Sequence, residues 1–266
     1  MKGAKVEAIE VNKTFGRGKG KVTAIRDLNM QVEENEFTVL VGPSGCGKST
    51  FLYMVAGFER PTSGKILLDG QPIEKPGPDR GFVFQEFVLY PWRTVLGNVT
   101  FGLEIAGMKK EEAQKEAMRY IEMVGLRGFE DKYPHTLSGG MKQRVGIARA
   151  LAYNPEVLLM DEPFGSLDAQ TRKVMQGELV RIWEEMKKTV IFVTHSVIEA
   201  TYLADKIVVM TARPGKVKGI VDVDLPRPRD YTGGKYLKIR KQVLDLVEEE
   251  VTKSLQISNV SEKSSL

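Results

Sequence analysis

The chain has 266 residues, 42% of them hydrophobic and 28% charged, with a formal net charge of +4. It is long enough to bury a substantial core as one large domain, with or without an inserted subdomain. The mild charge, without a basic run interleaved with aromatic residues, argues against a nucleic-acid partner. No run of about 18 apolar residues occurs, and MKGAKVEAIE does not resemble a signal peptide, so we expect a cytoplasmic protein that does not span a membrane by itself.

Residues 4–32 contain two alternating segments, VEAIEV and VTAIRDLNMQV, with a loop rich in Gly and basic residues between them at 16–21. Alternation of apolar and polar residues is typical of strands that are buried on one face. A further short strand is expected at 65–68, just before the turn Asp69-Gly70. These segments predict an antiparallel β-subdomain near the N-terminus.

Residues 37–51 read FTVLVGPSGCGKSTF and place a Gly-rich loop between a predicted strand and a predicted helix. A G-x-x-x-x-G-K-[ST] pattern in that context predicts a phosphate-binding loop. Its glycines let backbone N–H groups turn toward an anion, and the helix N-terminus adds partial positive charge. Lys48 can then reach the β- and γ-phosphates, and the Ser49 hydroxyl can bind Mg²⁺. The predicted nucleoside triphosphate site comprises Gly42, Pro43, Ser44, Gly45, Cys46, Gly47, Lys48, Ser49 and Thr50.

Cys46 is the one cysteine of the sequence, so the chain cannot form an internal disulfide. It also lacks neighbours with the spacing of metal ligands. We interpret it as a small residue that fills the phosphate loop, with a site of inhibition by thiol reagents as the alternative.

The middle of the chain is predicted to be helical. A strand at 81–85 is followed by the aromatic-rich loop EFVLYPWRT, and helices are expected at 98–106 and 111–124 because apolar residues recur at helical spacing. Ser138 is placed to cap a further helix that runs through 144–152.

The next part alternates between strands and helices: VLLMD, a helix at 169–187, TVIFVTH, a helix at 196–204, and KIVVM. Continuous apolar strands between helices predict a parallel sheet covered on both faces. The predicted fold is therefore α/β, with a helical subdomain of about 88–152 inserted into the core. A strand at 217–225, an amphipathic helix at about 235–252 and a polar tail from Ser254 follow. We expect one domain over 1–225 and an extension over 226–266.

Polar residues follow several predicted strands, at the sheet edge where parallel sheets bind ligands. Asp161 suits indirect coordination of Mg²⁺, and Glu162 can orient and deprotonate a water molecule. Gln85 has an amide that can bind Mg²⁺ or its water. His195 can donate a hydrogen bond to a γ-phosphate, and the alternative is a histidine with a structural role.

The segment 137–141, LSGGM, is a second candidate anion site, because Ser138, Gly139 and Gly140 stand at a predicted helix N-terminus. Two phosphate-binding elements in one chain suggest that they serve different molecules. These two elements, the motifs above and SLD at 166–168 follow one another in the order found in the ATPase subunit of an ATP-binding cassette (ABC) transporter. The sequence resembles that family over about residues 5–225.

The resemblance implies an ATPase that binds ATP with Mg²⁺ and forms a homodimer, in which the LSGGM segment of one subunit closes over ATP on the phosphate loop of the other. It implies that Glu162 is the catalytic base, that His195 senses the γ-phosphate, and that Asp168 belongs to a loop linking the two sites. Phe15 stands where the family places an aromatic residue that stacks on adenine. The family more often has Tyr there, and the ring face of Phe suffices for stacking.

Met141 departs from the Gln that is usual in the family's signature, whereas the backbone N–H groups and the Ser138 hydroxyl are retained. Met at this position, together with LYPWRTVLGNVTFGLE, TARPGKV and VDLPRPR, resembles the subgroup that imports nitrate, sulfonates and taurine. For that subgroup we expect a peripheral protein on the cytoplasmic face of the membrane. Its direct partners would be transmembrane permease subunits, and a solute-binding protein would be an indirect partner.

In the family, a groove near the glutamine loop receives a cytoplasmic helix of the membrane subunit. An apolar patch of this kind marks an interface, and the alternative is that its residues form the subdomain's own core. The residues concerned are Phe87, Leu89, Tyr90, Pro91 and Trp92. Two rival functions are a non-transport ATPase of the family acting on DNA or ribosomes, which usually has two cassettes or a long coiled coil, and a metabolic kinase, which gives no reason for LSGGM.

Overall fold

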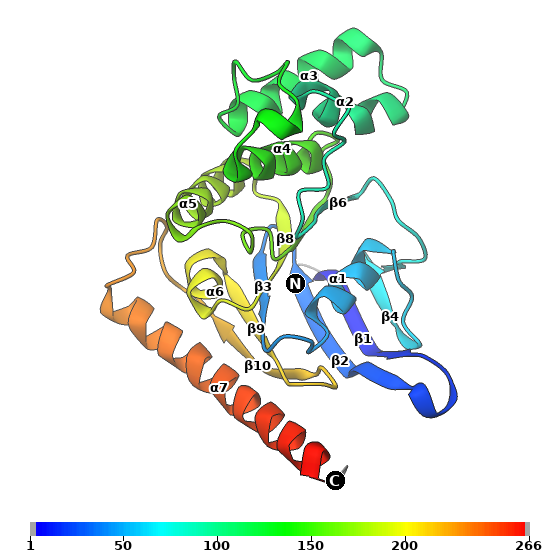
Figure 1. Ribbon diagram of the computed structural model, residues 1–266, viewed down its shortest axis with the longest axis vertical. Coiled ribbons are helices and arrows are strands. Elements are labelled where there is room, and N and C mark those ends of the chain that lie inside the picture. The colour runs from blue at the N-terminus through cyan, green and yellow to red at the C-terminus, as the bar shows by residue number, and fades with distance from the viewer. Residues whose placement is uncertain (1–3, 264–266) are drawn as a thin grey trace. The chain divides into compact units, whose positions relative to one another are not determined.

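The computed structural model describes residues 4–263. The chain divides into two compact units (Figure 1). The first unit comprises Met1–Gly77 with Thr189–Leu266, and the second unit comprises Pro78–Lys188. Each unit combines parallel strands with helices, as predicted for an α/β protein.

An antiparallel sheet forms the N-terminal part of the first unit, as predicted. Its strand order is β2-β1-β4-β5. Apolar residues alternate along β2, so that Leu28, Met30 and Val32 are all buried on one face. The strands are β1 (Ala4–Phe15), β2 (Val22–Glu33), β4 (Ser63–Leu68) and β5 (Gln71–Pro72), and a short 3-10 turn at Gly18–Gly20 joins β1 to β2.

Parallel strands form the other part of the first unit. Strand β3 lies between β8 and β9 and pairs in parallel with both, and β10 pairs antiparallel with β9. β3 and β8 are buried along their whole length, which explains why they are continuous apolar runs in the sequence. The elements are β3 (Phe37–Val41), α1 (Lys48–Ala56), β8 (Thr189–Thr194), α6 (Val197–Leu203), β9 (Lys206–Met210) and β10 (Val217–Asp222).

The C-terminal helix α7 runs from Gly234 to Lys263 and is longer than predicted. The predicted end near residue 252 is wrong, and the predicted polar tail is helical as far as residue 263; residues 264–266 lie outside the described part of the chain. α7 packs along α6, β9 and β10 (Figure 1). Its buried residues Tyr236, Val243 and Val247 recur at helical spacing and form the packed face.

The second unit contains one parallel pair of strands and four helices. Among these, α2, α3 and α4 pack on one another, and α4 also contacts β6 and α5 (Figure 1). The predicted helical segments are confirmed within a few residues. The elements are β6 (Arg80–Val83), α2 (Val95–Ile105), α3 (Lys110–Met123), a 3-10 turn (Pro134–Thr136), α4 (Gly139–Leu151), β7 (Val157–Asp161) and α5 (Ala169–Met186).

Two helix starts in the second unit show how local sequence sets their positions. Helix α2 begins three residues earlier than predicted, because the Thr94 side chain caps it by accepting a hydrogen bond from the Gly97 N–H at 3.1 Å. Ser138 caps α4 as predicted, by accepting from the Met141 N–H at 3.3 Å. Strand β6 ends at Val83 rather than at residue 85, so Gln85 lies in the following loop.

Candidate functional site

The phosphate loop links β3 to α1 in the first unit. Gly45 and Gly47 have φ angles of 73° and 100°, in the left-handed region that residues with side chains rarely adopt. Gly47 stands at the N-cap position, where no side chain caps the helix. The first N–H groups of α1 are therefore directed at the loop without a capping side chain, which is the arrangement that binds anions.

Lys48 is the first residue of α1 and is only 4% exposed. Its Nζ donates to the carbonyl oxygens of Gly42 at 2.8 Å and Pro43 at 2.9 Å. Carbonyl oxygens carry no net charge, so these bonds hold the ammonium over the loop without cancelling its charge. Such a charge attracts phosphate strongly in a buried site. Ser49 and Thr50 follow in the same turn and are half-buried.

Cys46 is fully buried within the phosphate loop. Burial raises the pKa of its thiol, and the nearby ammonium of Lys48, at 3.7 Å from Sγ, only partly offsets this. A protonated and inaccessible thiol reacts slowly, because the thiolate is the reactive form. These observations favour the interpretation that Cys46 fills the loop over the alternative of a reactive thiol.

Phe15 ends β1 and pairs across the sheet with Val22. Its side chain is 40% exposed, and Lys13 Nζ lies 4.8 Å from the centroid of its ring. The same hairpin touches the phosphate loop, because a Cβ added to Gly47 would lie 2.9 Å from Cγ1 of Ile25 on β2. An exposed aromatic ring is thus carried by the hairpin that packs on the phosphate loop.

His195 follows β8 directly and is exposed. Val41 pairs with Thr194, so the phosphate loop and His195 leave the parallel strands at the same edge. The Thr194 hydroxyl fixes the turn after the strand: it donates to Glu199 at 2.6 Å and accepts from the Ser196 N–H at 3.0 Å. The first unit therefore brings His195 and the phosphate loop to one edge of the sheet.

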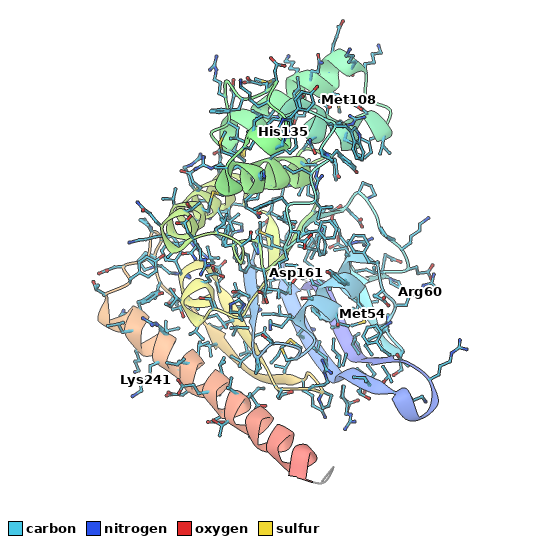
Figure 2. All side chains as sticks on the ribbon, in the orientation of Figure 1. Met54, Arg60, Met108, His135, Asp161 and Lys241 are labelled. Carbon is cyan, nitrogen blue, oxygen red and sulfur yellow. The ribbon has the colours of Figure 1, made fainter. Side chains whose placement is uncertain are left out.

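Asp161 and Glu162 lie at the carboxyl end of β7 in the second unit. Asp161, labelled in Figure 2, is the last residue of the strand and is 3% exposed. Val83 of β6 pairs with Met160, so Gln85 leaves the strands at the same edge. A Cβ added to Gly165 would lie 3.3 Å from the Glu162 carbonyl oxygen and 3.8 Å from Gln85 Nε2. The Gln85 amide and the turn after Glu162 are therefore neighbours.

The signature segment begins α4 and packs closely on its surroundings in the second unit. A Cβ added to Gly139 would lie 3.3 Å from Cδ2 of Leu167 and 3.7 Å from Cζ of Phe87. A Cβ on Gly140 would lie 2.9 Å from Cγ2 of Thr171 on α5, so only glycine fits there without a shift. The second unit thus brings the signature beside the loop that follows Gln85 and beside the start of α5.

Asp168 has a structural role that the sequence analysis did not predict. It caps α5 by accepting hydrogen bonds from the N–H groups of Gln170 and Thr171, both at 3.0 Å. Hydrogen bonds from Thr171, and from the Gln170 N–H, lower the pKa of Asp168. The signal was present in the sequence, since Asp is a preferred N-cap residue at the start of a periodic helix.

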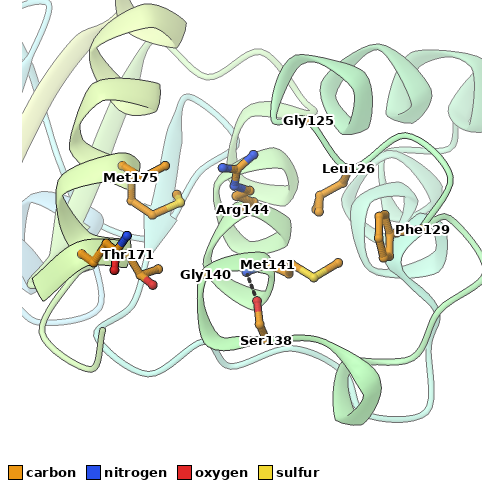
Figure 3. Close-up of a pocket in the computed structure, with 11 residues that line it drawn as sticks. Gly125, Leu126, Phe129, Ser138, Gly140, Met141, Arg144, Thr171 and Met175 are labelled. Carbon is orange, nitrogen blue, oxygen red and sulfur yellow. Dashed lines mark hydrogen bonds between the residues drawn. The ribbon is translucent and has the colours of Figure 1, made fainter. Parts of the chain in front are cut away.

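A pocket of about 400 Å³ lies beside the signature (Figure 3). Figure 3 shows the Met141 side chain extending toward Phe129, with Thr171 and Met175 on the opposite side of the helix that carries Met141. Met141 supplies an apolar side chain to the wall of this pocket, while its N–H donates to Ser138. The presence of Met rather than Gln at position 141 therefore leaves the cap of α4 by Ser138 intact. The pocket is lined by Gly125, Leu126, Phe129, Ser138, Gly140, Met141, Arg144, Gln170, Thr171, Val174 and Met175.

The side chains of the aromatic loop after Gln85 differ in their exposure to solvent. Asn98 is fully buried and fixes the loop, because its side chain donates to the carbonyl oxygens of Tyr90 and Arg93 and accepts from the Tyr90 N–H. The Tyr90 ring packs on Phe101 at a centroid distance of 4.4 Å. Trp92, in contrast, is 72% exposed. Tyr90 is therefore half-buried and packed within the second unit, whereas Trp92 presents an apolar ring to solvent.

Magnesium is the metal that the predicted site requires. Among the side chains that the structure describes, no three of His, Cys, Asp or Glu gather as they would in a metal centre made by protein alone. Mg²⁺ does not need one, because it usually takes one or two protein ligands and completes its shell with water and phosphate oxygens. Ser49, Gln85 and Asp161 offer a hydroxyl, an amide and a carboxylate oxygen, and this donor set fits Mg²⁺.

The helices in the described part of the chain all lack the combination of length and apolar content that a membrane span needs.

The family model for ABC transporters matches residues 25–165. The chain is 56% identical, over 95% of its length and 94% of the relative, to an uncharacterized ABC transporter ATP-binding protein of Methanocaldococcus jannaschii. It is 47% identical to the aliphatic sulfonates import ATP-binding protein SsuB of Bacillus licheniformis, over 94% of this chain and 97% of that protein. It is 44% identical to the nitrate import ATP-binding protein NrtD of a Synechocystis strain, over 89% of both chains.

A solved structure shows the same fold in a nucleotide-bound cassette. The dimeric structure of a post-hydrolysis state of the ATP-binding cassette MJ0796, bound to ADP and Pi, matches with a TM-score of 0.72 and 34% identity, over 83% of this chain and all of that one. The predicted cassette fold is thereby confirmed. Since the family model covers more than half of the sequence and the relatives cover nearly all of it, the chain belongs to the ABC transporter family and is an ATPase cassette of that family.

Proposed function

We propose that this chain is the ATP-hydrolysing subunit of an importer for a small sulfonate- or nitrate-like solute. It works as a homodimer on the cytoplasmic face of the membrane, together with separate transmembrane permease subunits. A solute-binding protein delivers the solute to the permease. ATP binding closes the dimer, and hydrolysis resets it.

The observation that carries this proposal is the presence of two separate helix starts with glycines, each suited to bind an anion. One is the phosphate loop with Lys48 at the start of α1. The other is the Ser138-capped start of α4, where Gly140 allows close packing. A protein that binds a nucleotide as a monomer needs only the phosphate loop. Two such elements suit a dimer in which each signature closes over ATP bound to the partner's phosphate loop.

Hydrolysis in this proposal depends on the phosphate loop and on side chains that follow parallel strands. The phosphate loop and Lys48 hold the β- and γ-phosphates of ATP. Glu162 accepts a proton from the attacking water, Gln85 helps to position the reacting groups, and His195 donates a hydrogen bond to the γ-phosphate. Ser49 is among the oxygen ligands that would hold Mg²⁺, which when bound would neutralise charge on the phosphates.

The remaining site residues have supporting roles in the proposal. Phe15 stacks on adenine, which its 40% exposure and its position on the β1–β2 hairpin support. Asp168 holds the start of α5 next to the signature and links the two sites of the dimer. Asp161 contributes to Mg²⁺ coordination through water from its buried position.

The aromatic loop is the proposed docking site for the permease. Trp92 and Val88 are 72% and 54% exposed, and neighbouring side chains fix the loop that carries them. Arg149 donates to the Val88 carbonyl oxygen at 2.8 Å, and its guanidinium lies 5.5 Å from the centroid of the Tyr90 ring. Exposed apolar side chains on a fixed loop suit an amphipathic helix of a partner subunit.

The solute class rests on resemblance to the importers, because the chain shares 47% identity with a sulfonate import subunit and 44% with a nitrate import subunit. To test it, the chain is co-expressed with candidate permease subunits, and the purified complex is placed in vesicles together with a candidate solute-binding protein. We expect uptake of labelled nitrate, taurine or an alkanesulfonate that depends on MgATP. Vesicles that take up none of these solutes would reject the proposed solute class.

The same preparation separates the transporter from its rivals. Trp92→Ala should reduce recovery of the permease with the subunit, whereas Phe58→Ala, which removes another exposed aromatic ring, should not. Hydrolysis that is stimulated by DNA or by ribosomes, with no hydrophobic subunit recovered from membranes, would instead support a non-transport ATPase.

A further inference from the structure

The loop Thr211–Lys216, between β9 and β10, packs directly against the phosphate loop. A Cβ added to Gly215 would lie 2.0 Å from the carbonyl oxygen of Cys46, so the two backbones are in close contact. Gly215 also joins this loop to β2: its N–H donates to the Ala24 carbonyl at 2.8 Å, and its carbonyl accepts from the Arg26 N–H at 3.0 Å. These contacts hold the loop in place against the phosphate loop, and we call it the bracing loop.

Arg213 extends from the bracing loop to the phosphate loop. Its Nε donates to the Gly45 carbonyl oxygen at 3.2 Å, and one of its terminal nitrogens lies 3.1 Å from the position of a Cβ added to Gly45. In a planar trans peptide the carbonyl and the following N–H point in opposite directions. By binding the Gly45 carbonyl, Arg213 therefore fixes the orientation of the whole Gly45–Cys46 peptide, including the Cys46 N–H, which donates to the Pro43 carbonyl oxygen at 3.4 Å.

Helix α7 fixes the other end of the bracing loop through Glu250. This residue is 4% exposed, and its carboxylate accepts from the Ala212 N–H at 3.1 Å. The same carboxylate pairs with Lys218 of β10 at 2.9 Å and with Lys253 at 2.8 Å. A buried carboxylate with three donors is held in one position. Since Ala212 is next to Arg213 in the chain, the contacts run from α7 through the bracing loop to Gly45.

We propose that Arg213 and Glu250 are positioning residues for nucleotide binding, through which the C-terminal helix controls the geometry of the phosphate loop and the affinity for MgATP. Displacement of α7 from the bracing loop then weakens ATP binding without any contact with the nucleotide. Because such coupling is reciprocal, MgATP binding also stabilises the docked position of α7. This role concerns the cassette alone and does not depend on which solute or permease it serves.

The first test compares Arg213→Ala with Lys216→Ala by measuring the Kd for MgATP in the purified chain. Both variants remove one positive charge from the bracing loop, but Lys216 pairs with Asp27 at 3.5 Å. We expect Arg213→Ala to raise the Kd about fivefold or more, the usual scale of coupling between sites. Arg213→Lys, which keeps a donor, should restore most of the affinity. In hydrolysis assays the KM should rise while kcat is largely kept. Equal Kd values for Arg213→Ala and Lys216→Ala would overturn the role of Arg213.

The second test addresses Glu250, with Glu249→Ala as the matched control. Glu249 also pairs with Lys218, at 2.7 Å, but its side chain is 62% exposed. Glu250→Ala should raise the Kd for MgATP, and Glu249→Ala should not. Combined with Arg213→Ala, the Glu250 substitution should add little, because both act through the same loop. Additive effects would reject the coupling from α7 to the phosphate loop.

A measurement on the wild-type chain tests the same coupling even where the Glu250 variant fails to fold. Hydrogen exchange is followed at the amides of residues 241–253 with and without MgATP. We expect slower exchange in α7 when MgATP is bound, because nucleotide and docked helix stabilise each other. Unchanged exchange in α7, with slower exchange in the phosphate loop, would overturn the proposal.

Discussion

Glu162 has a backbone conformation that is unusual for a residue with a side chain. Its φ angle is 40°, and it follows directly on the buried strand β7. Such conformations cost energy and persist where the surrounding structure enforces them. The turn is closed by a hydrogen bond from the Gly165 N–H to the Glu162 carbonyl at 3.0 Å. The backbone therefore fixes the point from which this carboxylate leaves the sheet edge.

Replacing Glu162 by Gln tests its proposed role as the general base. Gln keeps the size and hydrogen bonding of the side chain but cannot accept the proton, so we expect turnover to fall by about 10²-fold or more. The affinity for ATP should be kept. Steady-state hydrolysis and equilibrium nucleotide binding measure the two quantities. Glu184→Gln, at an exposed position on α5, is the control and should hydrolyse normally. Near-normal turnover of Glu162→Gln would remove this residue from the role.

The strand-end positions of Glu162 and His195 could be predicted from the sequence, because buried parallel strands are continuous apolar runs and the next residues must lie at the sheet edge. The contact of Arg213 with the phosphate loop could not. Its partner Gly45 is 168 residues away, and no local periodicity encodes such a contact. From the sequence alone, the stretch TARPGKV therefore indicates only a resemblance to the importer subgroup. The structure places it against the phosphate loop.

At the scale of elements, α7 is held by an ionic cluster as well as by its apolar face. Burial alone would raise the pKa of Glu250, but hydrogen bonds from Lys253, Lys218 and the Ala212 N–H outweigh it and lower the pKa from 4.5 to about 2. Because the pKa is lower in the folded state, this group stabilises the fold above about pH 4.5. The stabilisation is lost as the pH falls from about 4.5 to about 2.

We therefore expect Glu250→Gln to lower the free energy of unfolding near pH 7, by up to about 3 kcal/mol for a pKa shift of this size. The difference from the wild type should shrink as the pH falls below 4.5. Denaturant unfolding at a series of pH values measures it, with the exposed neighbour Glu248→Gln as the control. A difference that stays constant down to pH 2.5 would show that the Glu250 charge does not stabilise the docked helix.

Most elements could be predicted from periodicity, but several boundaries could not: β6 ends at Val83 rather than at residue 85, and β10 ends at Asp222 rather than at residue 225. The polar composition of the tail from Ser254 predicts that the last helix ends near residue 252, whereas the backbone continues as helix to Lys263. Helix α2 begins at Val95, before the predicted start, because the side chain of Thr94 caps it there. The division into Met1–Gly77 with Thr189–Leu266 and Pro78–Lys188 depends on contacts between segments that are far apart in the sequence.

At the scale of the whole molecule, the two anion-binding elements belong to different compact units. The phosphate loop lies in the first unit and the signature in the second. In the proposed homodimer each ATP is held by the phosphate loop of one subunit and the signature of the other. In a dimer with two-fold symmetry the interface is isologous, so each contact of a phosphate loop with the partner's signature occurs twice and gives two equivalent sites. The composite site therefore predicts complementation between variants that are each inactive.

Mixing Lys48→Ala with Ser138→Arg tests this composite site. Each variant alone should hydrolyse ATP very slowly, because Lys48→Ala removes the charge that holds the phosphates and Ser138→Arg obstructs the partner's site. In a mixed dimer, the intact phosphate loop of the Ser138→Arg subunit faces the intact signature of the Lys48→Ala subunit. We therefore expect the mixture to hydrolyse ATP faster than either variant alone, whereas a mixture of Lys48→Ala with the double variant should not. Hydrolysis by the first mixture that only averages the two separate rates would show that each subunit works with its own signature.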